Sequence, residues 1–192
     1  MSSAEPKTFP IQTFIERNLT RSLLAQYLDH IEPLAIQLWG TTLLVGVGET
    51  GLEFAVVENQ LAHLTKIDIL TYAFSPGLFV DMLNQAHGFP RAQMHLYPQT
   101  LQNLLEQQGL YQYESLLWTG VSPATLTPEI INTIGSHLAH GGTAYLTIQD
   151  YPEAASPWQH SHLDLNVIPN LPPHPISPPE LPYFGLIVEN HT

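Results

Sequence analysis

The sequence contains one glycine pattern with clear chemical potential, the Gly-x-Gly-x-x-Gly formed by Gly46, Gly48 and Gly51. Glycine lets the backbone approach a ligand closely, and the free N–H groups at the start of a helix attract electron-rich oxygen atoms. The pattern follows an apolar run at residues 41–45 and precedes apolar residues at helical spacing in residues 52–61. This context indicates a ligand-binding loop, while a tight turn that needs glycine for steric reasons is the alternative.

Other residues with metal-binding or catalytic side chains give weaker patterns. His160 and His162 flank Ser161 and lie near Asp164, a spacing that offers two imidazoles and a carboxylate to zinc. The chain has ten histidines, so coincidence is the favoured interpretation, and we predict no metal site. No Ser/His/Asp arrangement is recognisable, and no catalytic base is predicted.

Strand and helix patterns alternate through the middle of the chain. The apolar and β-branched runs predict strands, and apolar residues three and four positions apart predict the helices between them. Such alternation predicts an α/β fold with a doubly wound, Rossmann-like, mostly parallel sheet. The expected strands are residues 41–45, 64–73, 93–96, 115–119 and 143–149, and the expected helices are residues 52–61, 76–86, 101–109 and 127–138.

The two ends of the chain differ from this core. Apolar spacing predicts an N-terminal helical segment over residues 11–31, broken near Thr20, and a short helix over residues 34–39. Nine of the seventeen prolines lie in residues 151–183, which predicts an irregular excursion. Residues 163–168 and 183–188 are expected to add an antiparallel edge hairpin. We predict one domain, 1–192, with helices in 1–40, an α/β core in 41–150 and the proline-rich excursion and closing strands in 151–192.

Charge restricts the possible partners. Five Lys and Arg against seventeen Asp and Glu give a net charge of −12, and no basic residue follows Arg91. Nucleic acids and anionic membranes are bound largely through Lys and Arg, so neither is expected as a partner. A small molecule or a protein is expected instead, and the proline-rich segment is a possible substrate lid or docking strap. The chain has no cysteine, no apolar run long enough to span a membrane and no secretory signal, so a cytoplasmic location is expected.

The carboxyl ends of parallel strands meet at one sheet edge, where ligands bind. Trp118, Thr119 and Ser122 follow the fourth strand, and Asp150 and Tyr151 follow the fifth. These residues are expected to form the wall of a pocket, or in the case of the two aromatic residues to cap the core.

The order of these features, over about residues 34–150, resembles the class I S-adenosylmethionine-dependent methyltransferases. Residues 43–48 look like the first motif of that family, and Asp68 lies near the position of its ribose-binding acid. The most specific similarity is the glycine pair Gly141-Gly142 between a helix and the fifth strand. The resemblance implies S-adenosylmethionine as cofactor, with the following cofactor-binding residues: Gly46, Val47, Gly48, Thr50, Gly51, Asp68, Ile69, Gln99 and Trp118.

The sequence departs from that family at three positions. Leu44 stands two residues before the first glycine, where the family usually has an acid, and Thr50 stands at the third glycine position. Gln99 follows the third strand, where the family has an acid near the adenine amine. Asp68 is itself at risk, because a strand that continues to Ala73 would bury it.

Three functions follow from these patterns. The first is an S-adenosylmethionine-dependent methyltransferase acting on a small molecule or a protein. The second is a catalytically inactive protein of this fold that serves as an interaction or assembly module, because two expected carboxylates are missing. The third is a dinucleotide-dependent oxidoreductase, in which Asp68, seventeen residues after Gly51, would hold a ribose.

Overall fold

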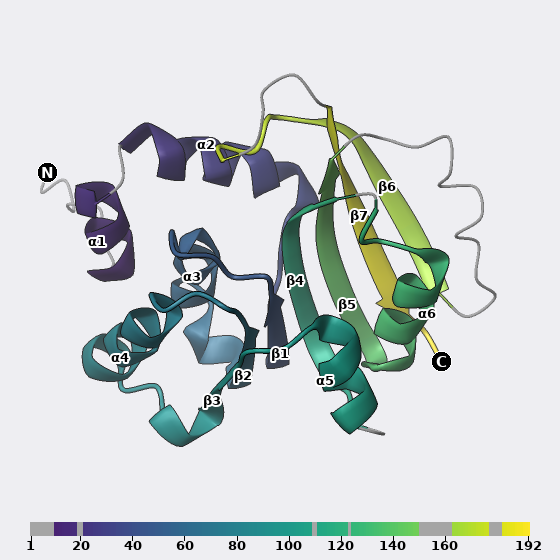
Figure 1. Ribbon diagram of the computed structural model, residues 1–192, viewed down its shortest axis with the longest axis horizontal. Helices are drawn as coiled ribbons and strands as arrows, with labels where there is room; N and C mark the ends of the chain where they lie inside the picture. Colours follow the sequence, from purple (N-terminus) through teal and green to yellow (C-terminus); the bar gives the residue numbers. More distant parts are fainter. Residues whose placement is uncertain (1–9, 19–20, 109–110, 123, 150–162, 177–181) are drawn as a thin grey trace, which may run out of the picture.

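The structure of the protein is a computed structural model and describes residues 10–18, 21–108, 111–122, 124–149, 163–176 and 182–192. Within these residues seven strands form one sheet in the order β3-β2-β1-β4-β5-β7-β6 (Figure 1). β1 pairs in parallel with β2 and β4, and the parallel pairing continues to β3 and β5. β7 joins β5 antiparallel and β6 pairs with β7, which confirms the predicted closing hairpin.

The strands and helices alternate as the sequence predicts. The strands are β1 (Gly40–Val45), β2 (Leu64–Leu70), β3 (Met94–Tyr97), β4 (Tyr113–Val121), β5 (Leu138–Gln149), β6 (Leu163–Leu171) and β7 (Tyr183–Asn190). The α-helices are α1 (Pro10–Asn18), α2 (Arg21–Ile31), α3 (Leu52–Glu58), α4 (Pro76–His87), α5 (Leu101–Gln108) and α6 (Pro128–Ser136). Short 3-10 turns are η1 (Glu32–Leu34), η2 (Leu61–His63) and η3 (Arg91–Gln93).

The sheet has a hydrophobic core on each face. Consecutive residues of β1 point to opposite faces, so Leu44 belongs to one core and Leu43 and Val45 belong to the other. Helices α1 to α4 cover the first face, and α5 and α6 cover the second. Because both faces are covered at the centre of the sheet, the last residues of β1 form a continuous buried apolar run. The doubly wound fold is confirmed.

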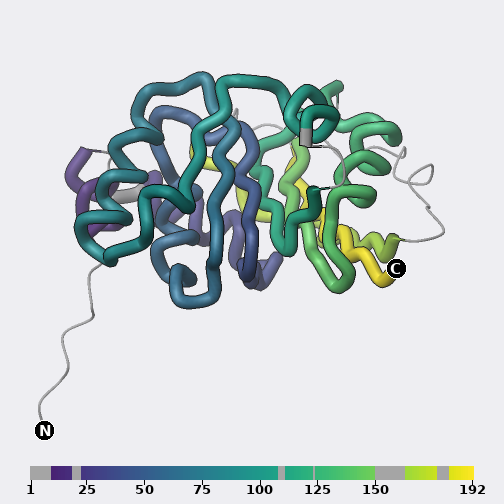
Figure 2. Tube along the Cα trace, turned by 90° about the horizontal axis from the view of Figure 1, so that it is seen from below, coloured from purple at the N-terminus to yellow at the C-terminus, as the bar shows by residue number. Residues whose placement is uncertain are grey.

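The N-terminal helices pack against the first face, and α1 lies at the end of the molecule away from the C-terminus (Figure 2). The carboxylate of Glu58, in α3, accepts backbone N–H groups from Ile11 at 3.2 Å and Gln12 at 3.4 Å. A carboxylate at these donors caps the start of α1 and attaches it to α3. His87 of α4 lies 2.7 Å from the same carboxylate, so three helices meet at Glu58.

Two predicted boundaries are wrong. Residues 34–39 form no α-helix, because the 3-10 turn η1 ends at Leu34 and Ala35 takes a left-handed conformation. The pair Gly141-Gly142 does not end a helix; α6 ends at Ser136, and both glycines lie within β5. A Cβ at Gly142 would lie 2.9 Å from the carbonyl oxygen of Tyr113, so this glycine permits close strand pairing. Among the described residues, no helix is long and apolar enough to cross a membrane.

Candidate functional site

The glycine loop turns sharply after β1 and is tied to the end of β2. Gly46 has a φ of +70°, which favours glycine. The N–H of Val47 donates to the carbonyl of Leu70 at 3.2 Å, and the hydroxyl of Thr71 donates to the carbonyl of Val47 at 2.6 Å. These two hydrogen bonds fix the glycine loop against the residues at the end of β2, at the carboxyl edge of the sheet.

The three glycines of the pattern have different surroundings in the folded protein. A Cβ at Gly48 would meet nothing within 4 Å, so this position borders open space. Gly51 is buried with a φ of +60°, and a Cβ there would lie 2.1 Å from the ring of Phe79. Gly51 therefore permits packing between α3 and α4. Thr50 and Gly51, both predicted to bind the cofactor, lie outside the cavity lining.

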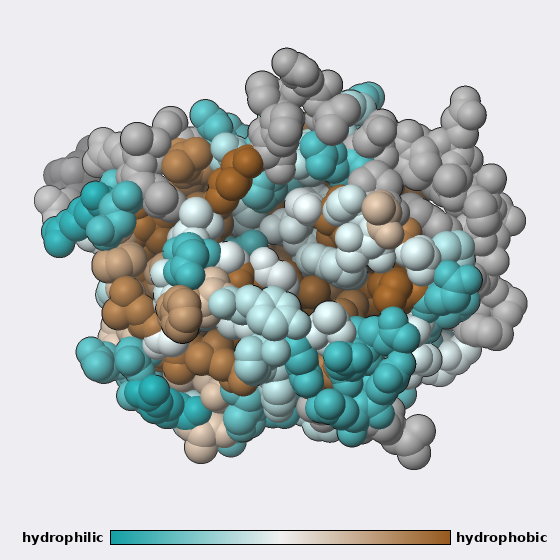
Figure 3. Space-filling view, viewed as in Figure 1, coloured by the Kyte–Doolittle hydropathy of each residue, from teal (hydrophilic) through white to brown (hydrophobic). Residues whose placement is uncertain are grey.

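A cavity of about 610 Å³ lies beside this loop, at the carboxyl ends of β1 to β4. Much of the centre of the face shown in Figure 3 is pale or brown, the colours of weakly polar and hydrophobic residues. The described residues that line the cavity are 45–48, 70–73, 99–102, Trp118, Thr125 and Ile130.

Five of the predicted cofactor-binding residues do line the cavity: Gly46, Val47, Gly48, Gln99 and Trp118. The indole Nε1 of Trp118 would lie 3.4 Å from a Cβ at Gly46, so the ring lies directly beside the glycine loop. Trp118 belongs to β4, and the predicted carboxyl edge of the sheet therefore brings the two segments together. Ser122 does not line the cavity, and Asp150 and Tyr151 lie outside the described residues.

The expected ribose contact of Asp68 is corrected by the structure. β2 continues to Leu70, so Asp68 lies within the strand and is fully buried. Its carboxylate accepts a hydrogen bond from the hydroxyl of Tyr113 at 2.9 Å and pairs with Lys66 at 3.1 Å. Ile69 is also buried and lies outside the lining. Thr71 and Tyr72 follow the end of β2 and line the cavity in place of Asp68. Since Asp68 is buried, it is also unable to make the ribose contact that the oxidoreductase hypothesis requires.

Glu49 follows the cavity residue Gly48 and holds the loop after β2. Its carboxylate accepts N–H bonds from Phe74 at 2.9 Å and Ser75 at 3.1 Å, and a further bond from the Ser75 hydroxyl. The hydroxyl and N–H donors of Ser75 and the N–H of Phe74 hold the pKa of Glu49 below its ordinary value. Glu49 therefore links the two loops beside the cavity as an ionised group.

Glu53 is a polar residue that the sequence interpretation missed. It lies in the first turn of α3 and is buried, and its Oε1 accepts the hydroxyl of Thr119 at 3.1 Å. Within the described residues, its Oε2 has no hydrogen-bond partner, and neither does the hydroxyl of buried Tyr27. Burial raises the pKa of Glu53 and favours the neutral carboxyl. In the sequence, the only sign of a special role for Glu53 is its charge among the apolar residues of this helix.

Residues that follow β6 cover the ends of β4 and β5. Nδ1 of His30 lies 2.5 Å from the carbonyl oxygen of Pro172, and its Nε2 lies 2.9 Å from the hydroxyl oxygen of Thr147. A carbonyl only accepts, so Nδ1 carries the proton and Nε2 accepts from Thr147. The ring of His174 packs edge-on against His30, with centroids 5.0 Å apart. The described part of the proline-rich excursion thus packs against α2.

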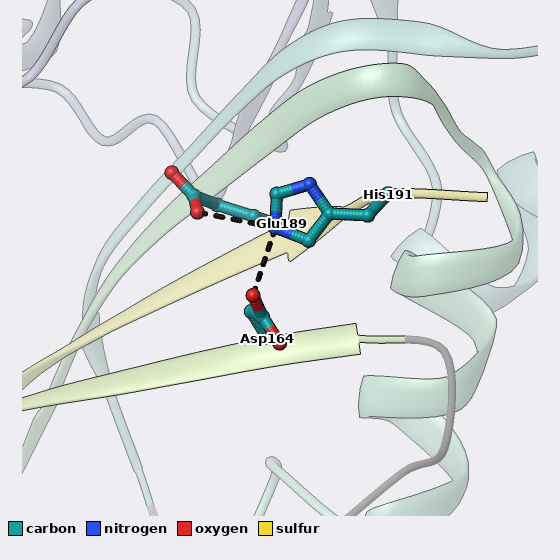
Figure 4. Close-up of side chains that lie close together, drawn as sticks. All are labelled: Asp164, Glu189 and His191. Atoms are coloured by element: carbon teal, nitrogen blue, oxygen red, sulfur yellow. Dashed lines mark ion pairs between the residues drawn. The ribbon is translucent and has the colours of Figure 1, made fainter.

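Asp164, which the sequence places near His160 and His162, lies in a surface cluster with Glu189 and His191 (Figure 4). Nε2 of His191 lies 2.9 Å from Oδ2 of Asp164 and 3.6 Å from Oε2 of Glu189. Asp164 of β6 and Glu189 of β7 are paired across the two strands. All three side chains are exposed, and His191 pairs with two carboxylates that face each other across the strands. His160 and His162 lie outside the described residues.

No protein-family model and no curated protein matches this sequence. Solved methyltransferase structures match its fold. An rRNA methylase from Streptococcus thermophilus is 17% identical, with 98% of this chain and 100% of that chain covered and a TM-score of 0.56. The N-methyltransferase NodS from Bradyrhizobium japonicum is 11% identical, with 93% and 97% covered and a TM-score of 0.52. The fold is therefore that of the class I S-adenosylmethionine-dependent methyltransferases.

Proposed function

We propose that this protein binds S-adenosylmethionine beside Gly46 and Gly48 and transfers its methyl group to a small molecule or a protein. The observation that carries this proposal is the open cavity at the carboxyl edge of the sheet. Ligands of doubly wound sheets bind at this edge. A cavity of about 610 Å³ is in the size range of small-molecule sites, and no side chain of the described residues fills the space next to Gly48.

The residues of the cavity suit an adenosyl group. Gly46 and Gly48 allow close approach of the ligand to the backbone, and the amides of Gln99 and Gln102 offer donors and acceptors to a purine. Trp118 adds an aromatic ring beside the loop. S-adenosylmethionine supplies an already activated methyl group, so the protein contributes mainly by positioning the reactants.

The charge of the chain supports a small-molecule or protein acceptor. The rRNA methylase of similar fold is named for an RNA substrate, whereas this chain has only five Lys and Arg and a net charge of −12. Phosphate backbones are bound through cationic side chains, which this chain lacks after Arg91.

Isothermal titration with S-adenosylmethionine and S-adenosylhomocysteine tests the proposal. At least one ligand should bind, and affinity should fall from wild type to Gly48→Ala and further to Gly48→Leu, because the added side chain enters the cavity. Thermal unfolding of both variants checks that they remain folded. Absence of binding by both ligands at about millimolar concentration, an affinity limit near −4 kcal/mol, would overturn the proposal.

A second candidate is a non-catalytic interaction module, and one surface feature favours it. Tyr72, which lines the cavity, is 71% exposed, and Phe74 is 93% exposed. Exposed aromatic residues at a rim are typical of contact sites for proteins. This candidate predicts a stoichiometric complex that Phe74→Ser disrupts; such a complex with a protein that binds no adenosyl ligand would favour it over the enzyme.

A further inference from the structure

The closing hairpin carries three potential metal ligands: Asp164 of β6, Glu189 of β7 and His191, which directly follows β7 (Figure 4). One ligand atom from each of these side chains lies within 4.8 Å of the other two. Glu189 pairs with Thr143 of β5, and Thr143 pairs with Ser115 near the amino end of β4. The cluster therefore lies toward the end of the sheet opposite the carboxyl edge that bears the cavity, and it is a separate site.

The distances in the cluster fit a tetrahedral zinc ion. Zinc lies about 2.0–2.2 Å from imidazole nitrogen and carboxylate oxygen, which places two of its ligand atoms roughly 3.4 Å apart. Nε2 of His191 lies 2.9 Å from Oδ2 of Asp164 and 3.6 Å from Oε2 of Glu189, so both distances are within about 0.5 Å of that spacing. Because all three side chains are exposed, small rotations bring their ligand atoms to the spacing that zinc requires.

The charges in the cluster favour a divalent cation. Asp164 and Glu189 are paired across β6 and β7, and like charges at paired positions destabilise a sheet. No Lys or Arg occurs after Arg91. Among the described residues, His191 is the only side chain that forms an ion pair with either carboxylate. A neutral imidazole leaves both negative charges uncompensated, whereas one divalent cation compensates both.

The backbone on both sides of His191 is fixed by Asn190. The buried side-chain amide of Asn190 donates to the carbonyl oxygen of Leu138 at 2.8 Å. Its oxygen accepts hydrogen bonds from the N–H of Thr192 at 3.0 Å and from the hydroxyl of Thr192 at 2.7 Å. Groups that orient a metal ligand raise the affinity of the site. Asn190 therefore keeps the imidazole beside the two carboxylates.

We propose that Asp164, Glu189 and His191 bind a divalent transition-metal ion of the zinc type, which links the edge strand β6 to β7. The imidazole nitrogen selects zinc and similar ions over Ca²⁺ and Mg²⁺, which prefer oxygen ligands. Three protein ligands leave the fourth position of a tetrahedral ion to water. An ion that binds only the folded hairpin stabilises this edge of the sheet, whether or not the protein transfers methyl groups.

The sequence alone predicts no metal site because this ligand set is not contiguous. Asp164 precedes Glu189 and His191 by more than two strand lengths, and the pairing of β6 with β7 brings the three side chains together. The local pattern of His160 and His162 near Asp164 is therefore a different set of potential ligands.

Isothermal titration of the protein with zinc chloride tests the site. Wild type should bind zinc, and His191→Gln should lose one bound ion per chain or bind it at least about tenfold more weakly. His63→Gln removes an exposed histidine outside the cluster and should bind zinc as the wild type does. Equal binding by all three proteins, no binding by the wild type, or equally tight binding of calcium or magnesium chloride would overturn the proposal.

Thermal unfolding tests the link between the strands. Zinc chloride should raise the unfolding temperature of the wild type and of His63→Gln by at least about 2 °C, and EDTA should reverse this increase. The unfolding temperature of His191→Gln should not respond. The double variant His160→Gln/His162→Gln should retain the wild-type response, because these histidines are outside the proposed ligand set. Loss of the response in the double variant, or its retention in His191→Gln, would overturn the proposal.

Discussion

Thr119, near the carboxyl end of β4, donates its hydroxyl to the buried carboxyl of Glu53 on α3, with 3.1 Å between the two oxygen atoms. This bond engages one carboxyl oxygen, and the other has no partner among the described residues. Buried polar groups in folded proteins are nearly always hydrogen-bonded, so a half-satisfied carboxyl in the core marks a position where stability is sacrificed.

Glu53 should make the stability of the protein depend on pH. Burial raises the pKa of its folded-state carboxyl, so the folded protein holds the proton more tightly than the unfolded chain. The stability that this proton contributes is present at low pH and is lost as pH rises from the unfolded value of about 4.3 through the higher folded value. Urea unfolding of Glu53→Gln should therefore lose less stability over this range than the wild type.

Glu106→Gln is the control for that experiment, because Glu106 is exposed on α5. It should follow the wild-type pH dependence. If Glu53→Gln also follows the wild type, Glu53 ionises as freely in the folded protein as in the unfolded chain, and the prediction is wrong.

Gly51→Ala should destabilise the protein strongly. Its Cβ would lie 2.1 Å from the ring of Phe79, which stacks on Phe54, and the residue has a φ of +60°. Overpacking together with a left-handed backbone should lower the free energy of unfolding by about 2–4 kcal/mol. The neighbouring Gly48→Ala adds the same methyl group in open space and should change stability by less than about 1 kcal/mol. Similar losses in both variants, measured by urea unfolding, would contradict this assignment.

The parallel sheet could be predicted from the sequence because its strands and helices are marked by local patterns. The apolar runs at β1 and β4, the glycine loop and the helical spacings predict the alternation, and a parallel sheet with both faces covered is the compact solution for it. The pair Gly141-Gly142 was misassigned because glycine ends helices and also permits close backbone approach within strands. Only the pairing of β5 with β4, near Tyr113, distinguishes these two uses.

The site was less accessible to sequence reasoning. Trp118 was found because the ends of parallel strands share one edge, and Gln99 was found through the resemblance to the methyltransferases. The ribose contact of Asp68 was taken from the resemblance, although the predicted strand 64–73 already placed this residue mid-strand. Its partner Tyr113 is brought to it only by folding. Glu53 was missed because its only local signal is a charge at an otherwise apolar helix position, and its burial depends on how residues of β4 and α2 pack around α3.

Trp118→Ala should weaken ligand binding. The indole lies beside Gly46 and lines the cavity, and stacking of a base on an aromatic ring contributes about 1–3 kcal/mol. The affinity for S-adenosylhomocysteine should therefore fall by about tenfold to a hundredfold in isothermal titration. Trp39→Ala is the matched control, because Trp39 is 42% exposed and lies outside the cavity lining. Equal losses in the two variants would place the ligand elsewhere.

His174 should give the protein a second pH dependence, of opposite sign to that of Glu53. Its ring packs against Tyr27 and His30 of α2 and Tyr183 of β7. Burial, with a smaller effect of the nearby His30, lowers the pKa of His174 to about 4. The folded protein therefore resists protonation that the unfolded chain accepts. The stability from the neutral ring is present above the unfolded pKa of about 6.5 and is lost as pH falls toward about 4.

Replacement of this ring removes that dependence. Between about pH 7 and pH 4.5, His174→Gln should lose about 1–2 kcal/mol less stability than the wild type, a range that allows for the partial exposure of the ring. Exposed His63→Gln is the control and should follow the wild type. Because each variant is compared with itself at two pH values, altered packing at residue 174 cancels. If all three proteins lose the same stability on acidification, packing against α2 and β7 does not shield His174 from protonation.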